Sequence, residues 1–206
     1  MKVALLSDCY LPRLGGIEVQ VHDLAAHLVG AGHEVEVFTA TAGEDGQRGG
    51  QVEEVDGVAV HRFALPLPYG VPVNPLAPPE VRRRLRAGGF DVAHVHMGVV
   101  SPFAMDMARV SIGIGLPTAV TWHCLLDRSR PLMSTAGYAR RWAHRGAALS
   151  AVSGMAAARV ADIAGGATVG VLPNGIDVAT WAPAEGALTG EVTQPGQTVR
   201  VAAAMR

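Results

Sequence analysis

Two adjacent glycines near the amino terminus have the setting of an anion-binding turn. Gly15 and Gly16 stand between an apolar run at residues 3–6 and a patterned segment that begins at Ile17. Glycine has no Cβ, so a phosphate can approach its backbone N–H groups, and the start of a helix adds partial positive charge. A glycine pair in this position can also form a turn without binding an anion. We therefore expect Gly16 to admit a phosphate and Gly15 to need a positive φ.

Histidines mark the carboxyl ends of two further predicted strands. His96 ends one strand, and His123 follows the next. Ligands of open α/β sheets gather outside the carboxyl ends of the strands. We therefore expect His96 to border a ligand and His123 to contact it. The alternative for His123 is to cap its strand or to pair with Asp127. His94 lies deeper in its strand and is expected to be a hydrogen-bonded core residue.

Two carboxylates near the same predicted edge are candidates for lining a substrate cleft. They are Asp8, which follows the first strand, and Glu18, in the first turn of the first helix. A carboxylate in that turn also stabilises the helix dipole, so Glu18 has a structural alternative. The histidine pair at the second strand has no third ligand close in sequence, and no metal is predicted.

No cofactor is predicted either. The Gly-x-Gly segments at residues 30–32 and 113–115 precede predicted strands, whereas a dinucleotide-binding fingerprint follows a strand and begins a helix. The formal net charge of −1 gives no reason to expect a nucleic-acid partner. Apolar residues make up 49% of the 206 residues, which is typical of a globular chain. The amino-terminal apolar run is too short for a signal peptide or a membrane span, so a cytoplasmic location is expected.

Strand and helix signals alternate along the chain, which is typical of a parallel sheet covered by helices. Asp56-Gly57 is a hairpin signal within the third apolar segment. The expected fold is α/β, a doubly wound, Rossmann-like parallel sheet. The predicted strands cover residues 3–7, 34–39, 52–63 as a hairpin, 91–96, 117–122, 149–153 and 169–172. The predicted helices cover residues 17–31, 80–87, 101–114, 136–148 and 154–164.

The end of the chain differs in composition from the rest. Residues 185–197 are polar and contain glycine, and an apolar strand pattern follows from Val199. We expect one domain over residues 1–184, a linker over 185–198, and the first strand of a second domain over 199–206.

Several short motifs, in this order and spacing, resemble the amino-terminal half of a retaining, nucleotide-sugar-dependent glycosyltransferase of family 4, which has the two-domain GT-B fold. The resemblance covers essentially the whole chain. The motifs are Ser7-Asp8-x-Tyr10-x-Pro12, Gly15-Gly16-Ile17-Glu18, His33-Glu34-Val35, Asp91-Val92-Ala93-His94-Val95-His96, Thr121-Trp122-His123, Ala151-Val152-Ser153 and Leu172-Pro173-Asn174-Gly175-Ile176-Asp177.

The resemblance implies roles for individual residues. Gly15 and Gly16 would present backbone N–H groups to the donor diphosphate, and Arg206 would pair with it. His123 would be the catalytic residue, beside the donor sugar and the acceptor. A structural turn before the second domain is assigned to Asn174, Gly175 and Asp177.

The implied activity is transfer of a sugar from a nucleotide-sugar donor to an acceptor, with retention and without a metal. The donor contacts of the second domain would be missing here, so this chain alone is expected to be inactive. The alternatives are a sugar-nucleotide epimerase and a stand-alone, non-catalytic ligand-binding module. The acceptor, a small molecule or a lipid-linked one, is not specified by the sequence. Arg82 to Arg86 and the proline-rich segment 65–79 are candidates for peripheral membrane contact.

Overall fold

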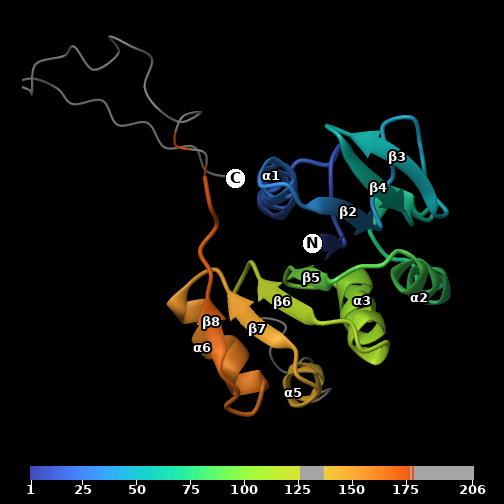
Figure 1. Cartoon of the computed structure of the whole chain (residues 1–206). Helices are drawn as coiled ribbons and strands as arrows, with labels where there is room; N and C mark the ends of the chain where they lie inside the picture. Colours follow the sequence, from blue (N-terminus) through green and yellow to red (C-terminus); the bar gives the residue numbers. More distant parts are fainter. Residues whose placement is uncertain (126–136, 177, 179–206) are drawn as a thin grey trace, which may run out of the picture. The chain divides into compact units, whose positions relative to one another are not determined.

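One mostly parallel sheet organises the part of the chain that the computed structural model describes, residues 1–125, 137–176 and 178. Its strand order is β3-β4-β2-β1-β5-β6-β7-β8 (Figure 1), and β3 alone pairs antiparallel with its neighbour. The strands are β1 (Lys2–Ser7), β2 (Glu34–Thr39), β3 (Gln51–Val55), β4 (Val58–Arg62), β5 (Val92–Met97), β6 (Thr118–Trp122), β7 (Ala148–Ala151) and β8 (Val169–Val171).

The central strand β1 explains the doubly wound arrangement. Its residues from Val3 to Ser7 are buried, as expected for a strand covered on both faces. The chain leaves β1 toward β2 and later returns to its other side as β5, so the strand order reverses there. Such a reversal opens a crevice at the carboxyl ends of the two strands. The predicted α/β, doubly wound fold is confirmed.

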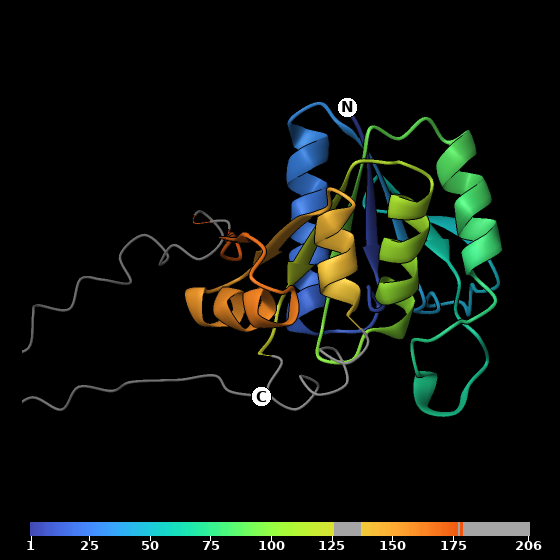
Figure 2. The same cartoon turned by 90° about the horizontal axis from the view of Figure 1, so that it is seen from below.

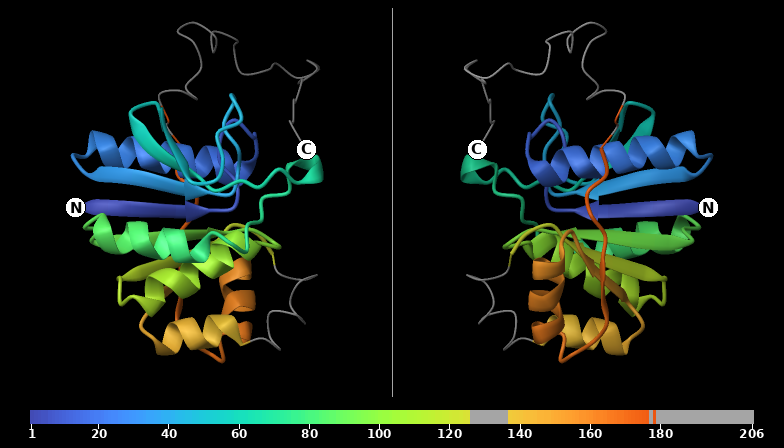
Figure 3. Two further views of the ribbon diagram at one scale, coloured as in Figure 1. Left: turned by 90° about the vertical axis from the view of Figure 1, so that its right-hand side faces the viewer. Right: turned by 90° about the vertical axis from the view of Figure 1, so that its left-hand side faces the viewer.

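Helices cover both faces of the sheet. Figure 3 shows α1 on one side and α2 and α3 on the other, and Figure 2 shows α6 (orange) lying across the direction of the other helices. The helices are α1 (Gly16–Gly30), α2 (Pro78–Ala87), α3 (Pro102–Gly113), α5 (Tyr138–His144) and α6 (Gly154–Ile163), with a 3-10 turn η1 (Pro68–Gly70).

Two apolar cores hold the layers together. The smaller one joins α1, through Val21 and Ala25, to β1 and β2. The larger one joins α2, α3, α5 and α6 to the other face, around Phe103 and Trp122. Burial of this apolar surface is the main stabilising contribution that fixes the strand ends in place.

Local turn chemistry accounts for two boundaries. Asp56 and Gly57 both have positive φ, 49° and 78°, which is the requirement of a type I′ hairpin between β3 and β4. The helix predicted over 136–148 is shorter than expected, since α5 ends at His144 and Gly146 takes a φ of 84°. A residue at positive φ cannot continue a right-handed helix.

The carboxyl-terminal predictions lie outside the described residues. The chain separates into a compact unit, Met1–Gly175, and a second unit, Ile176–Arg206. The predicted linker over 185–198, the predicted strand over 199–206, and Asp177 and Arg206 are not among the described residues. Within the described ranges, no helix has both the length and the apolar character needed to cross a bilayer.

Candidate functional site

The carboxyl ends of β1, β5 and β6 bring the predicted site residues to one edge of the sheet. The backbone N–H of His123 donates to the carbonyl oxygen of Met97 at 2.9 Å, which joins the ends of β6 and β5. A Cβ built on Gly98 would lie 3.3 Å from Cδ1 of Ile17, so the end of β5 also meets the start of α1. Gly15, Gly16 and His123 therefore lie along the same edge, as predicted.

The two glycines differ in what surrounds them. Gly15 has an extended backbone, with φ −169° and ψ 172°, so the predicted positive φ is wrong. A Cβ on Gly15 would instead lie 2.2 Å from Oε2 of Glu18, which folds back over the first turn of α1. A side chain at position 15 would therefore compete with the Glu18 carboxylate for this space. A Cβ on Gly16 would meet nothing within 4 Å, so the backbone there is open to an approaching group.

Glu18 gives the start of α1 an internal anion. Its side chain is buried and its Oε1 lies 3.2 Å from Nε of the half-exposed Arg13. The first N–H groups of a helix have no partner within the helix, and a carboxylate in the first turn compensates them. A second anion at Gly16 would have Arg13 nearby to balance the Glu18 charge. Contact between Glu18 and a substrate stays a prediction.

Asp8 is turned into the fold and is only 5% exposed. Its Oδ1 accepts the backbone N–H groups of Phe103 at 2.9 Å and Ala104 at 3.4 Å, at the start of α3. Burial raises the pKa of Asp8 to about 6, although the hydroxyl of Ser101 and these N–H groups act in the opposite direction. Its Oδ2 is buried and has no hydrogen-bond partner among the described residues. Asp8 thus caps α3 from β1, and a substrate contact stays a prediction.

Three histidines stack behind the edge. The ring centroids of His94 and His96 are 4.1 Å apart, and those of His96 and His123 are 5.2 Å apart. Nδ1 of His96 lies 3.0 Å from Nε2 of His123. His96 is only 2% exposed, so it lies behind His123 and does not border open space as the sequence had suggested. His94 bonds through Nε2 to the hydroxyl of Thr121 at 2.7 Å, which confirms the predicted hydrogen bonding, although the residue is only partly buried.

Burial keeps these imidazoles neutral. It lowers the pKa of His94 to about 4, with a further contribution from His123. Burial also lowers the pKa of His96 and of His123, and a positive charge on any one ring would oppose a charge on the next. The cluster therefore offers neutral donors and acceptors at physiological pH.

Asn174, which the sequence assigned only to a structural turn, lies close to His123 in the structure. It follows β8, and the N–H of Leu172 donates to the carbonyl of Ala151 at 2.8 Å, which fixes this segment at the edge. An interaction of the imidazole with the side-chain carbonyl of Asn174 raises the pKa of His123 and so partly offsets the effect of burial. The rule that places ligands beyond parallel strand ends also applies to the segment after β8 and could have identified Asn174.

The family model for Glycosyltransferase Family 4 matches residues 14–180, which is most of this chain and includes the whole edge from Gly15 to Asn174. The chain belongs to glycosyltransferase family 4. It is 29% identical over 189 residues to a phosphatidyl-myo-inositol mannosyltransferase of Mycolicibacterium smegmatis, covering 89% of this chain and 46% of that protein. It is also 26% identical over 122 residues to a GDP-mannose-dependent alpha-mannosyltransferase of Mycobacterium tuberculosis, covering 59% of this chain and 32% of that protein.

Solved structures share the fold of this family 4 chain. A sucrose-phosphate synthase from Thermosynechococcus elongatus has a TM-score of 0.61 at 15% identity, over 89% of this chain and 50% of that one. The Anabaena protein HepE, solved in complex with UDP, has a TM-score of 0.59 at 19% identity, over 88% and 46%. The family 4 chain spans about half the length of the phosphatidyl-myo-inositol mannosyltransferases and of these two structures, and its match covers about a third of the GDP-mannose-dependent relative.

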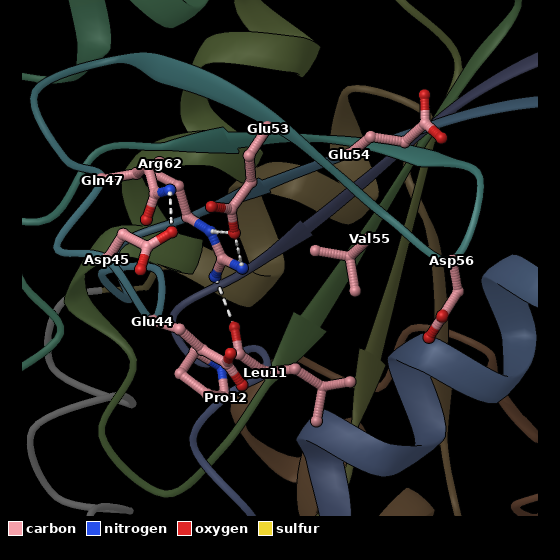
Figure 4. Close-up of a pocket in the computed structure, with 10 residues that line it drawn as sticks. All are labelled: Leu11, Pro12, Glu44, Asp45, Gln47, Glu53, Glu54, Val55, Asp56 and Arg62. Atoms are coloured by element: carbon pink, nitrogen blue, oxygen red, sulfur yellow. Dashed lines mark hydrogen bonds and ion pairs between the residues drawn. The ribbon is translucent and has the colours of Figure 1, made fainter.

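A cavity of about 530 Å³ lies elsewhere on the family 4 domain (Figure 4). Figure 4 shows the buried Arg62 pointing toward Glu53 and the carbonyl of Leu11, with both of which it forms hydrogen bonds. None of the predicted site residues lines this cavity, so it is separate from the histidine edge. Its lining residues are Leu11, Pro12, Glu44, Asp45, Gln47, Glu53, Glu54, Val55, Asp56 and Arg62.

The described residues of the family 4 chain contain no metal-ligand cluster. Across residues 1–125, 137–176 and 178, no three side chains of histidine, cysteine, aspartate or glutamate are grouped so that they could hold an ion. His94 and His96, which the sequence placed on one strand face, are used in the stack and in the bond to Thr121.

Proposed function

We propose that the chain is one domain of a glycosyltransferase that moves a sugar from a nucleotide-sugar donor to an acceptor. The observation that carries the proposal is the meeting, at one sheet edge, of the open backbone at Gly16 and the neutral histidine His123. The family membership supports it, and two relatives are named as mannosyltransferases.

The proposed chemistry uses fixed dipoles. When the glycosidic bond to the donor breaks, negative charge grows on the departing nucleoside diphosphate. Backbone N–H groups at the start of α1 point toward such a charge and stabilise it without reorganising. Gly16 leaves room for the phosphate to approach. Arg206 would add a cation, as the family resemblance implies. Retention of configuration and independence of metals and cofactors belong to the same proposal.

A second domain would complete the site. Val99, Val100, Leu125 and Leu172 follow the ends of β5, β6 and β8 and are exposed. Exposed apolar side chains of this kind, gathered at one edge, mark a surface that another protein layer covers. A covering domain would exclude water from the reaction and supply the remaining donor contacts. We therefore propose that the chain is inactive by itself.

A lipid-linked acceptor is favoured by one surface of the domain. Leu67, Tyr69, Val71 and Leu76, from the proline-rich segment, are exposed. An apolar surface next to cations suits the boundary of an acidic membrane. The nearby basic helix α2 contributes less than the sequence suggested, because Arg84 turns inward to bond Glu80, His61 and the carbonyl of Gly50.

Vesicle binding would test the membrane contact. The intact protein should sediment with vesicles that contain anionic phospholipid and remain in solution with neutral ones. Substituting Leu67 and Tyr69 with serine should weaken the sedimentation. Equal behaviour with both vesicle types would exclude an electrostatic membrane contact.

A transfer assay would test the function itself. The intact protein is incubated with GDP-mannose or UDP-sugars and with extracted lipids or sugars as acceptors, with and without EDTA. We expect release of nucleoside diphosphate only when acceptor is present, a product with the donor's anomeric configuration by NMR, and no effect of EDTA. Consumption of the donor without an acceptor would favour the epimerase. Tight donor binding by the 206-residue chain without turnover of the intact protein would favour the binding module.

A further inference from the structure

One buried arginine holds the loop that leads into the glycine pair. Arg62, the last residue of β4, is only 1% exposed. Its Nη1 donates to the carbonyl oxygen of Leu11 and, at 3.4 Å, to that of Thr41. Its Nε and Nη2 both donate to Oε1 of Glu53 (Figure 4). A single guanidinium thus joins the loop after β1, the segment after β2, and β3.

The loop between β1 and α1, residues 8–15, contains neither helix nor strand. Its backbone groups therefore need partners on neighbouring elements. The carbonyl oxygen of Leu11 has such a partner in Arg62. Only three residues separate Leu11 from Gly15, which directly precedes α1. The contact with Arg62 thus fixes the chain just before it enters the helix.

The ion pair between Arg62 and Glu53 is a weak source of stability by itself. Burying two charges costs hydration, and this cost offsets much of the attraction between them. Apolar side chains of similar volume could fill the same space, often without loss of stability. They could not donate to the carbonyl oxygen of Leu11, as the guanidinium does. What Arg62 adds beyond packing is the path of the loop.

We infer that Arg62 is a positioning residue, which acts through the Leu11 carbonyl to hold the Gly15-Gly16 backbone where an anion can approach it. The inference rests on the proposed function, because the donor diphosphate is that anion. Arg62 does not contact the diphosphate itself, since its side chain is buried and directed to Glu53 and to backbone carbonyls. It keeps the N–H groups preorganised, and a displacement of about 1 Å in such a site weakens its interactions strongly.

A second inward-turned arginine offers a matched control. Arg84 also pairs with a carboxylate, that of Glu80, and also donates to a carbonyl oxygen, that of Gly50. Each guanidinium lies over an aromatic ring, at 5.7 Å from the centroid for Arg62 and at 5.3 Å for Arg84. The two arginines differ in what they hold. Arg84 bonds the segment before β3, and Arg62 bonds the loop before α1.

Amide signals of the 206-residue chain test the placement without any assay of activity. In NMR spectra of 15N-labelled protein, Arg62→Met should shift the signals of Gly15 and Gly16 more than Arg84→Met does. Methionine keeps most of the packing but has no N–H group to donate. If Arg62→Met fails to fold because Glu53 loses its partner, the double variant Arg62→Met/Glu53→Gln removes both charges and gives the same reading. Unchanged glycine signals in either folded variant would overturn the inference.

Binding of a nucleoside diphosphate to the intact enzyme is the second readout. Calorimetry with GDP and with UDP should show a Kd raised by about 10-fold in Arg62→Met and unchanged in Arg84→Met, at a temperature where both variants are folded. Arg62→Lys should recover part of the loss, because its ammonium group can still donate to the Leu11 carbonyl. A purely structural arginine would leave the affinity of the folded protein unchanged.

The positioning role and the proposed function fail separately. Equal diphosphate affinity in Arg62→Met and in the unsubstituted enzyme would overturn the positioning role. Shifted signals of Gly15 and Gly16, together with no diphosphate binding by the unsubstituted intact enzyme, would instead refute the proposed function. The placement of the glycine pair by Arg62 would then still stand.

Discussion

His61 and the stack of His94, His96 and His123 use their ring nitrogens differently. Both ring nitrogens of His61 form hydrogen bonds. Nε2 lies 2.6 Å from Oε2 of Glu36, and Nδ1 lies 2.6 Å from the guanidinium of Arg84. Its ring also stacks on Phe38, with centroids 4.1 Å apart and planes 4° apart. In the stack at the sheet edge, Nε2 of His96 and Nδ1 of His123 are both buried and have no hydrogen-bond partner among the described residues.

The surroundings of His61 form a closed network. Glu36 also accepts from Lys2 at 2.7 Å, so β1, β2, β4 and α2 are joined through polar contacts. Burial alone would raise the pKa of Glu36, but hydrogen bonds from Lys2 and His61 outweigh it and lower the pKa. A network whose members are all satisfied makes a fold rigid. The histidine stack differs, because two of its ring nitrogens are left without a partner among the described residues. The comparison therefore assigns His61 to structure, whereas the role of His123 in the site stays a proposal.

The largest expected effect is on catalysis. Replacing His123 with alanine in the intact enzyme should lower kcat/KM by about 100-fold, or about 2.7 kcal/mol, as for loss of one well-placed polar contact. Because His123 lies at a strand end, the unfolding temperature should change little. Steady-state kinetics and calorimetry would check both. Near-normal turnover would assign His123 to structure and remove the contrast with His61.

The reverse pattern is expected for His61. Alanine at this position leaves Glu36 and Arg84 each without one buried partner, and the free energy of unfolding should fall by about 2 kcal/mol. Donor binding should be unchanged. His144→Ala, at an exposed position of α5, is the control and should change stability by less than about 0.5 kcal/mol. A loss of donor affinity in His61→Ala with unchanged urea unfolding would contradict the assignment.

Asp8 should give the domain a pH-dependent stability. Its pKa is raised from 3.8 to about 6 in the folded state, so the folded chain holds its proton at a higher pH than the unfolded chain does. Stability from this group is therefore full below pH 4 and declines as the pH rises to 6 and above, by at most about 3 kcal/mol. Asp8→Asn should lack this decline.

Urea unfolding of both proteins at pH 4, 5, 6 and 7 would measure the difference. The Asp8→Asn variant should gain stability relative to the unsubstituted chain as the pH increases. Parallel curves for the two proteins would show that the Asp8 carboxyl is not the titrating group.

The smallest expected effect distinguishes the two glycines. Gly16→Ala should weaken binding of a nucleoside diphosphate to the intact enzyme by about 10-fold, because a methyl group would fill the space left open at the backbone. Its stability should stay the same or rise by up to about 1 kcal/mol, since alanine favours helices. Gly15→Ala should displace the Glu18 carboxylate and lower stability by about 1 kcal/mol. Calorimetry and thermal unfolding of both variants would check this, and equal effects would remove the distinction.

Most helices and strands could be predicted from the sequence, because the signals for them lie in short local segments. Apolar runs, helix periods and the Asp56-Gly57 turn predicted the elements, and the rule for parallel strand ends predicted that Gly16 and His123 would share an edge. The roles of Asp8 and His96 were not predicted correctly, because they depend on contacts between residues far apart in the sequence, which local sequence patterns do not reveal. The capping of α3 by Asp8 spans 95 residues of sequence. The contact between His96 and His123 depends on the pairing of β5 with β6.

The two outer strands of the sheet also bear on how the protein behaves at high concentration. An open edge offers unpaired backbone groups to another chain, and edge strands that are short or charged discourage such pairing. β3 is an edge strand that carries the exposed Glu54, so a second copy of β3 laid against it would bring like charges together. The opposite edge strand, β8, is only three residues long and presents little to pair with. Both edges of the sheet, as far as the described residues form it, thus disfavour edge-to-edge association.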